Sequence, residues 1–125
     1  MKTKGEVESK ISEAIVQFEI DHMGRGPKEA RTHIIEDMVF VRLKGVLTPA
    51  EQQLTRNADG VELIKKVRST LIENARPVLA QAISDITGLK VVSLHTDIST
   101  KSGERVIVFT LERDLEKALP HKKAY

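Results

Sequence analysis

The fold is decided by the segment Gly24–Leu54, which reads GRGPKEARTHIIEDMVFVRLKGVLTPAEQQL. Its middle part, Arg31–Leu43, is rich in the β-branched and apolar residues that favour strands. The two acidic residues Glu36 and Asp37 interrupt this run and predict the turn of a β-hairpin. The turn lacks the glycine that two-residue hairpin turns prefer, so the apolar pattern carries this prediction.

A two-residue turn at this point fixes the register of the hairpin and the residues on each face. It predicts the pairs Ile35 with Met38, Ile34 with Val39, and Thr32 with Val41. One face then carries Ile34, Val39, Val41 and Leu43, and the other carries His33, Ile35, Met38, Phe40 and Arg42. Neither face is strongly polar, which is typical of a hairpin that is covered on both sides.

Helix signals lie on both sides of this hairpin. The run Thr48–Glu51 is a capping box with proline at the first helical position, so it predicts a helix that begins near Thr48. The run Asn57–Gly60 then predicts an interruption of that helix by a turn. Before the hairpin, residues 6–23 predict an amphipathic helix that ends at Gly24, a favourable residue just past a helix end. Its apolar side chains are Val7, Ile11, Ala14, Ile15 and Phe18.

A long apolar stripe at helical spacing runs from Val61 to Thr87, and Gly88 ends it. A helix of this length spans on the order of 40 Å, which exceeds the width of a compact domain of this size. Pro77 lies inside the stripe, where proline kinks or breaks a helix. Two arrangements stay open: two helices that fold back on each other, or one long helix that projects and needs a partner chain.

Residues 89–111 predict a second hairpin, with Ser102 and Gly103 as its two-residue turn. This register pairs Ile98 with Ile107, Thr96 with Phe109, and Leu94 with Leu111. The face expected against the helices carries Val92, Leu94, Ile98, Ile107, Phe109 and Leu111. After this hairpin, residues 114–119 predict one short turn of helix.

The order of elements is helix, hairpin, helix or helix pair, hairpin. This order predicts an α+β fold, namely a two-layer sandwich in which four mainly antiparallel strands pack on two or three helices. We expect residues 1–119 to form a single domain and residues 120–125 to form a flexible C-terminal tail.

Composition narrows the function classes. Among the 125 residues, 40% are hydrophobic and 30% are charged, as in a folded globular domain. A net charge of +2 and an aromatic content of 3% argue against a nucleic-acid binder. There is no cysteine, so disulfides and thiolate metal ligands are excluded. No apolar run approaches the roughly 20 residues of a membrane helix or suggests a signal peptide, so we expect a cytoplasmic protein without a membrane span.

The glycine-rich turn that precedes the first hairpin is the first candidate site. Its glycines would let a ligand approach the backbone, and its cations could hold a phosphate or a carboxylate. The spacing matches neither a P-loop nor a dinucleotide-binding fingerprint. The structural alternative is a helix end followed by a strand entry that proline makes rigid. The predicted anion site consists of Arg25, Gly26, Lys28 and Arg31.

A second candidate is the polar strand face that carries His95 and Asp97. Residues two apart share a strand face, and a carboxylate beside an imidazole can orient it as a base or as a metal ligand. Ser93 lies on the same face, but no nucleophile or third ligand has a diagnostic spacing. We therefore predict no catalytic residue and interpret His95 and Asp97 as part of a polar surface, with a role as base or metal ligand as the alternative.

Two histidines and a group of helix cations have spacings that are not diagnostic of a site. His22 and His33 flank the glycine-rich turn, but their spacing is not that of a metal site, and we predict neither a metal nor a cofactor. Lys65, Lys66 and Arg68 are interpreted as a solvated helix face, with contact to an acidic partner as the alternative.

Three runs of the sequence resemble the MpsC-like family of small bacterial domains: GRGPKEAR, DMVFVRLKGVLTPAEQQL and VVSLHTDISTKSGERVIVFTL. Their order and spacing match between about Gly24 and Leu111, and from His95 onward the third run departs from the family pattern only at Ser102. The family name comes from a sodium-translocating system that generates membrane potential and whose other components are membrane proteins. The resemblance implies a cytoplasmic accessory component that docks on a membrane complex, and it assigns no catalytic residues.

These observations order three hypotheses. The leading one is a non-catalytic accessory or regulatory protein, a homodimer, that interacts with a membrane system translocating Na⁺ or inorganic carbon. The alternative is a sensor that binds a small anion or nucleotide at the turn Gly24–Arg31. An enzyme that uses His95 and Asp97 ranks last.

Overall fold

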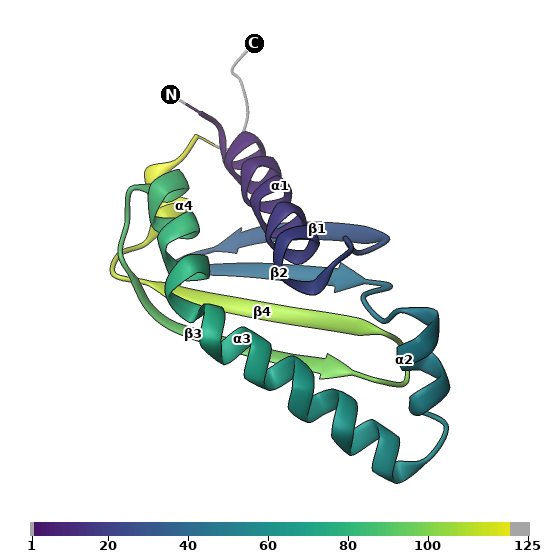
Figure 1. Ribbon diagram of the computed structural model, residues 1–125. Helices are drawn as coiled ribbons and strands as arrows, with labels where there is room; N and C mark the ends of the chain where they lie inside the picture. Colours follow the sequence, from purple (N-terminus) through teal and green to yellow (C-terminus); the bar gives the residue numbers. More distant parts are fainter. Residues whose placement is uncertain (1, 121–125) are drawn as a thin grey trace.

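The computed structural model describes residues 2–120. Within this range the chain forms the predicted α+β fold, in which helices pack on one face of an antiparallel sheet (Figure 1). The predicted tail falls largely on residues 121–125, which lie outside the described residues. The elements are, in chain order, α1 (Lys4–Met23), β1 (Glu29–Ile35), β2 (Met38–Lys44), α2 (Pro49–Leu54), α3 (Ala58–Thr87), β3 (Val91–Ser99), β4 (Glu104–Leu111) and α4 (Leu115–Ala118).

Helix α1 is closed at both ends by local interactions. Thr3 and Glu6 form a capping box, so the helix begins two residues before the predicted start. Gly24 ends it in the left-handed conformation, at φ 91°, and donates its N–H to the carbonyl of Ile20. One side of α1 is buried, as the helical spacing predicts, and it consists of Val7, Ile11, Ile15, Phe18 and Glu19.

The first hairpin has the predicted register, with Ile35 opposite Met38 and Ile34 opposite Val39. Glu36 takes the positive φ, 55°, that glycine usually supplies in such turns. Helix α4 holds this turn, because a carboxylate oxygen of Glu116 accepts the Glu36 N–H at 2.9 Å and the Glu116 N–H donates to the Glu36 carbonyl at 3.1 Å. The expected cover on both faces is not found within residues 2–120, where the outer face is left open.

Helix α2 begins where the sequence predicts, whereas α3 begins at Ala58, three residues before the predicted stripe and inside the predicted turn. Thr48 and Glu51 form the capping box of α2, and Asn57 caps α3 by accepting the Gly60 N–H at 2.9 Å. Gly60 permits the close approach of the two helices, since a Cβ atom there would lie 1.6 Å from the carbonyl oxygen of Leu54. Helix α3 is 30 residues long and includes Pro77, so the single long helix is the arrangement that forms.

The register predicted for the second hairpin is wrong by two residues. Ile98 lies opposite Arg105, and Leu94 lies opposite Phe109. The turn comprises the four residues between Ser99 and Glu104, and Gly103, at φ 71°, donates its N–H to the Ser99 carbonyl at 2.8 Å. A shift of two residues keeps each side chain on its face, so most of the predicted inward residues are buried.

Val92 is the exception on the inward face, because it is 66% exposed. The ladder between β3 and β4 is irregular between Val91 and Ser93, and this extra residue breaks the alternation of faces. The prediction that Val92 packs on the helices is therefore wrong.

The sheet has the order β1-β2-β4-β3, and every neighbouring pair is antiparallel. Helix α1 packs mainly on β1, and α3 packs along β3 and against α1, so both lie on the same face of the sheet (Figure 1). The core between these layers includes the fully buried Ile11, Ile15, Ile34, Leu43, Ile72, Leu79, Ile83, Ile107 and Phe109.

Candidate functional site

The structure separates the residues of the predicted anion site. Arg25 donates from Nη2 to the carbonyl of Gly45 at 3.1 Å. The aliphatic part of Lys28 lies against Gly45, where a Cβ atom would be 2.6 Å from it, and the Lys28 N–H donates to the Lys44 carbonyl. Both cations therefore hold the end of β2. Gly26 packs against the side chain of Ile20, and Arg31 lies on the outer face of β1.

Arg31 instead belongs to a basic pocket on the uncovered face of β1 and β2. The pocket has a volume of about 330 Å³ and is lined by Glu29, Arg31, His33, Arg42 and Lys44. Glu29 lies 2.8 Å from Nε of Arg31 and 3.9 Å from Nζ of Lys44. The hydrogen bond from Arg31 and the charge of Lys44 lower the pKa of Glu29. The pocket thus gathers more positive than negative groups on a solvent-exposed surface.

The polar face of β3 carries Ser93, His95 and Asp97. Nε2 of His95 lies 3.2 Å from Oγ of Ser93, which also contacts Oγ1 of Thr110. Asp97 accepts the N–H of Ile98 at 2.8 Å and lies 3.8 Å from Nζ of Lys65. His95 and Asp97 share this face but have separate partners. The geometry is that of a polar surface along an edge strand.

The two remaining histidines lie in different environments. His22 stacks on Phe18 with ring centroids 4.4 Å apart, next to α3, whereas His33 lies in the basic pocket on the other face of the sheet. Among residues 2–120, no group of three or more histidine or acidic side chains could hold a metal ion.

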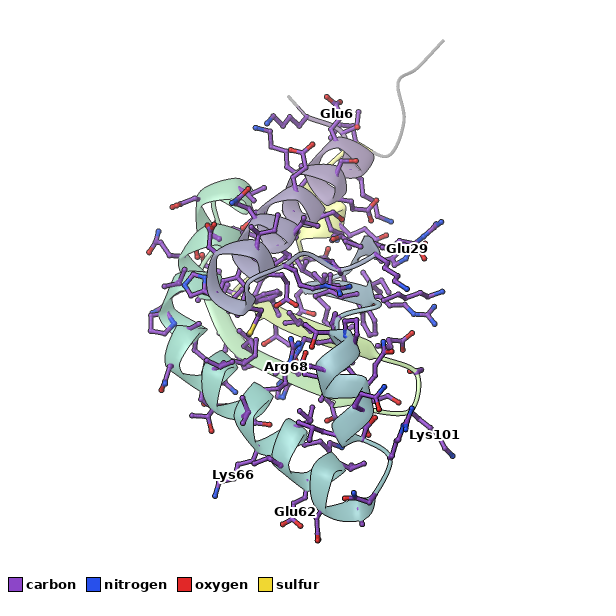
Figure 2. All side chains as sticks on the ribbon, turned by 45° about the vertical axis from the view of Figure 1, so that its right-hand side comes forward. Glu6, Glu29, Glu62, Lys66, Arg68 and Lys101 are labelled. Carbon is purple, nitrogen blue, oxygen red and sulfur yellow. The ribbon has the colours of Figure 1, made fainter. Side chains whose placement is uncertain are left out.

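Arg68 is not part of a solvated helix face, and this prediction is wrong. Its side chain is only 4% exposed and points from α3 toward the interior, opposite to Lys66 (Figure 2). Arg68 donates to both carboxylate oxygens of Glu51, at 2.6 and 2.9 Å, and to the carbonyl of Val46 at 2.9 Å. Burial raises the pKa of Glu51, but hydrogen bonds from Arg68 and Thr48 outweigh this and lower it. The pair ties α2 and the end of β2 to α3.

Two further charged residues are buried near Arg68, and the sequence analysis missed both. Glu19 and Arg105 are each 1% exposed. Nη1 of Arg105 donates to Oγ1 of Thr96 at 2.8 Å. Oε2 of Glu19, Nη1 of Arg68, and Nε and Nη2 of Arg105 have no hydrogen-bond partner among the described residues. Burial raises the pKa of Glu19 and lowers that of Arg105, while their opposite charges act against both shifts.

A signal for this charged cluster is present in the sequence. Glu19 continues the spacing of Ile11 and Ile15 along α1, at positions four residues apart. Arg68 likewise lies between Ile64 and Ile72 on α3, and Arg105 begins the inward series of β4 that continues with Ile107 and Phe109. When several elements each carry one charged residue in their apolar series, those residues are expected to meet and pair in the core.

The uncovered face of the sheet also carries an apolar strip. Met38, Phe40, Val106 and Val108 are half-buried by their cross-strand neighbours, and no helix lies over them within residues 2–120. Phe40 lies opposite Val108 in the ladder of β2 and β4. Such strips on a folded domain mark surfaces that contact other molecules.

The fold and these surfaces define a small α+β protein whose distinctive features are contact surfaces and a buried charge cluster. The chain belongs to the MpsC family, described as Na⁺-translocating membrane potential-generating system (MpsC), whose model matches residues 3–113. This confirms the family to which the sequence was assigned by resemblance. None of the helices described within residues 2–120 is long and apolar enough to cross a membrane.

Two proteins of Bacillus subtilis (strain 168) are similar to the chain. Uncharacterized protein YbcI is 49% identical over 118 residues, which cover 94% of this chain and 95% of YbcI. Uncharacterized protein YrhF is 28% identical over 95 residues, which cover 75% of this chain and 78% of YrhF. No solved structure gave a significant match.

Proposed function

We propose that the chain is a non-catalytic accessory protein that docks on a membrane-embedded partner through the uncovered face of its sheet. The carrying observation is the apolar strip of Met38, Phe40, Val106 and Val108, which no element covers within residues 2–120. Family membership supports this proposal, because the family description names a Na⁺-translocating system. The partner we propose is a membrane subunit that transports Na⁺ or inorganic carbon.

The charge of this face indicates which surface of the partner it would contact. The basic pocket adjoins the apolar strip because Phe40 and Arg42 are two residues apart on β2 and so lie on the same face. A partner with an acidic segment beside an apolar patch would complement both features. In this proposal the protein is cytoplasmic and peripheral to the inner face of the membrane.

The contacts of the candidate residues are the basis on which we propose a role without catalysis. Acid–base chemistry needs a titratable side chain within reach of a bound substrate. The exposed His95 contacts the hydroxyl group of Ser93, and Glu19 and Arg105, whose pKa values burial shifts, lie in the core. Reproducible turnover of a metabolite by the purified protein, lost on His95→Ala without loss of folding, would contradict this proposal.

The docking proposal is tested by co-purification of the tagged chain with co-expressed membrane subunits of the system. We expect the double variant Phe40→Ala with Val108→Ala to weaken binding about tenfold or more, since both side chains belong to the apolar strip. Ile20→Ala is the matched control, because Ile20 is an exposed apolar residue of α1 in the helix layer, away from the uncovered sheet face. Equal loss in the control, or no binding by the unmodified protein, would remove the proposal.

A second candidate function is a sensor of small anions or nucleotides. The observation that favours it is the basic pocket, where Arg31, Arg42 and Lys44 surround Glu29. A thermal-shift screen with phosphate, citrate and nucleotides tests it, with Arg31→Ala and Arg42→Ala expected to abolish any shift. Arg25→Ala with Lys28→Ala should leave the shift unchanged, and its loss in this variant would place the anion at the glycine-rich turn.

A further inference from the structure

The solvent side of α3 carries a second apolar surface, separate from the sheet. We call it the apolar band, and it is formed by Leu54 of α2 with Leu63, Val67, Leu71 and Val78 of α3. Their exposed fractions are 46%, 52%, 45%, 38% and 51%, in that order. Figure 1 shows that the N-terminal half of α3 runs past the end of α1. Leu63 and Val67 belong to this half of the helix and are exposed.

The apolar band continues into a groove between α1 and α3. This groove has a volume of about 270 Å³, and its walls are almost entirely apolar. Val78 belongs to both the band and the groove, and the α1 wall includes Phe18 and His22. The two features together make one apolar surface along most of α3, whereas single exposed apolar residues are ordinary.

We propose that the apolar band is the interface between two copies of this chain, with the two α3 helices packed antiparallel across a two-fold axis. The axis would pass near Thr70 and Leu71. In that register Leu63 of one copy lies beside Val78 of the other, at both ends of the contact. Each copy then presents the same surface, as a two-fold interface requires.

In this arrangement the charged side chains beside the band of one copy face side chains of opposite charge in the other copy. Lys66 and Glu73 are seven residues apart, so they lie on the same flank of α3, and both are exposed. Within its own helix Oε2 of Glu73 also lies 2.8 Å from Nε of Arg76, which leaves its second carboxylate oxygen for Lys66 of the other copy. In an antiparallel helix pair equivalent flanks face each other, so Lys66 of each copy meets Glu73 of the other. Figure 2 shows that Lys66 and Glu62 point away from the body of the protein, where a second copy can reach them.

The length of α3 suits a stable dimer. In this register the two α3 helices overlap from Ala58 to Ile83, about 38 Å, and a strip of that length and one helix width covers on the order of 400 Å² per copy. Leu54 and the groove wall on α1 enlarge this surface toward the roughly 800 Å² per partner of a specific interface.

The same flank is unlike that of a membrane-surface helix. Such helices carry mainly lysine and arginine beside their apolar face, because anionic lipids attract them. Here the charged side chains beside the band have both signs and nearly cancel: Asp59, Glu62, Lys66, Glu73 and Arg76. A second copy with matched charges is therefore the occupant that this surface favours.

The first experiment measures mass in solution as a function of protein concentration, by sedimentation equilibrium. We expect the unmodified protein to be a dimer with a micromolar dissociation constant. We expect Val67→Asp to raise that constant roughly 30-fold or more, because it places a charge in the centre of the interface. Val92→Asp is the matched control and should leave the dimer intact, since Val92 is exposed on β3 outside the apolar band. Circular dichroism verifies that both variants are folded.

The second experiment tests the register. Lys66→Glu and Glu73→Lys should each weaken the dimer, and the double variant should restore it, because the two charges are exchanged. The chain has no cysteine, so single introduced cysteines report distances without interference. Thr70→Cys should form a disulfide-linked dimer on mild oxidation, while the exposed Ser102→Cys in the second hairpin turn should not.

Several results would overturn the proposal. One is a monomeric mass for the unmodified protein at 100 μM or above, on the order of the concentrations at which weak specific pairs form. Another is equal dissociation by Val67→Asp and Val92→Asp. A third is binding of the monomer to anionic lipid vesicles through Val67, which would make a membrane the occupant of the band.

Discussion

At the scale of single residues, the carboxyl group of Glu19 couples stability to pH. Burial raises its pKa above the ordinary value of 4.5, so the folded protein holds this proton more tightly than the unfolded chain does. The free energy of unfolding therefore falls as the pH rises from 4.5 through the raised pKa. Glu19→Gln removes this dependence. We expect the melting temperature of the variant, relative to the unmodified protein, to increase between pH 4.5 and pH 8.

The control for this prediction is Glu62→Gln, since Glu62 is exposed on α3. Its melting temperature should follow that of the unmodified protein across the same pH range. Parallel curves for Glu19→Gln and the unmodified protein would mean that the carboxyl group of Glu19 ionises as it does in the unfolded chain.

Position 60 has no room for any side chain, so it requires glycine. A Cβ atom there would lie 1.6 Å from the carbonyl oxygen of Leu54, which is backbone and cannot move aside easily. We expect Gly60→Ala to destabilise the protein by about 2 kcal/mol or more, despite the gain of about 1 kcal/mol that alanine brings to a helix. Gly5→Ala in α1 is the matched control, because its Cβ would meet no atom within 4 Å, and it should be neutral or stabilising. Urea denaturation measures both.

At the scale of elements, α3 shows how a helix can include an interior proline. Pro77 cannot donate to the carbonyl of Glu73, but both residues are exposed, so water can satisfy that carbonyl. We expect Pro77→Ala to raise the free energy of unfolding by about 1–2 kcal/mol, since it restores the missing hydrogen bond at a smaller cost in unfolded-state entropy. Chemical denaturation tests this. A destabilised variant would indicate that the proline shapes α3 to fit the sheet.

Elements that depend on local signals could be predicted from the sequence, and those that depend on distant contacts could not. The capping box at Thr48 and the register of the first hairpin are local, and the structure has both. The register predicted for the second hairpin was wrong because Ser102-Gly103 also suits the end of a four-residue turn. The charged cluster of Glu19, Arg68 and Arg105 could not be assembled, because three separate elements have to pack before these residues meet.

At the scale of the whole molecule, the two layers separate the two contact surfaces. The apolar band lies on the helix layer, and the apolar strip and basic pocket lie on the opposite face of the sheet. A dimer formed through α3 therefore leaves both open sheet faces directed outward. Such a dimer would be bivalent toward a membrane-embedded partner.

Bivalency makes a prediction that separates the two proposed surfaces. On membranes that contain many partner molecules, we expect the unmodified dimer to bind about 10–100-fold more tightly than the monomeric Val67→Asp variant, because the second contact is intramolecular. With one partner per detergent micelle, the two proteins should bind equally, since Val67 is remote from the sheet face. Binding assays in both settings measure this. If Val67→Asp is weaker by the same factor in detergent, the apolar band itself contacts the partner, and the separation of surfaces is wrong.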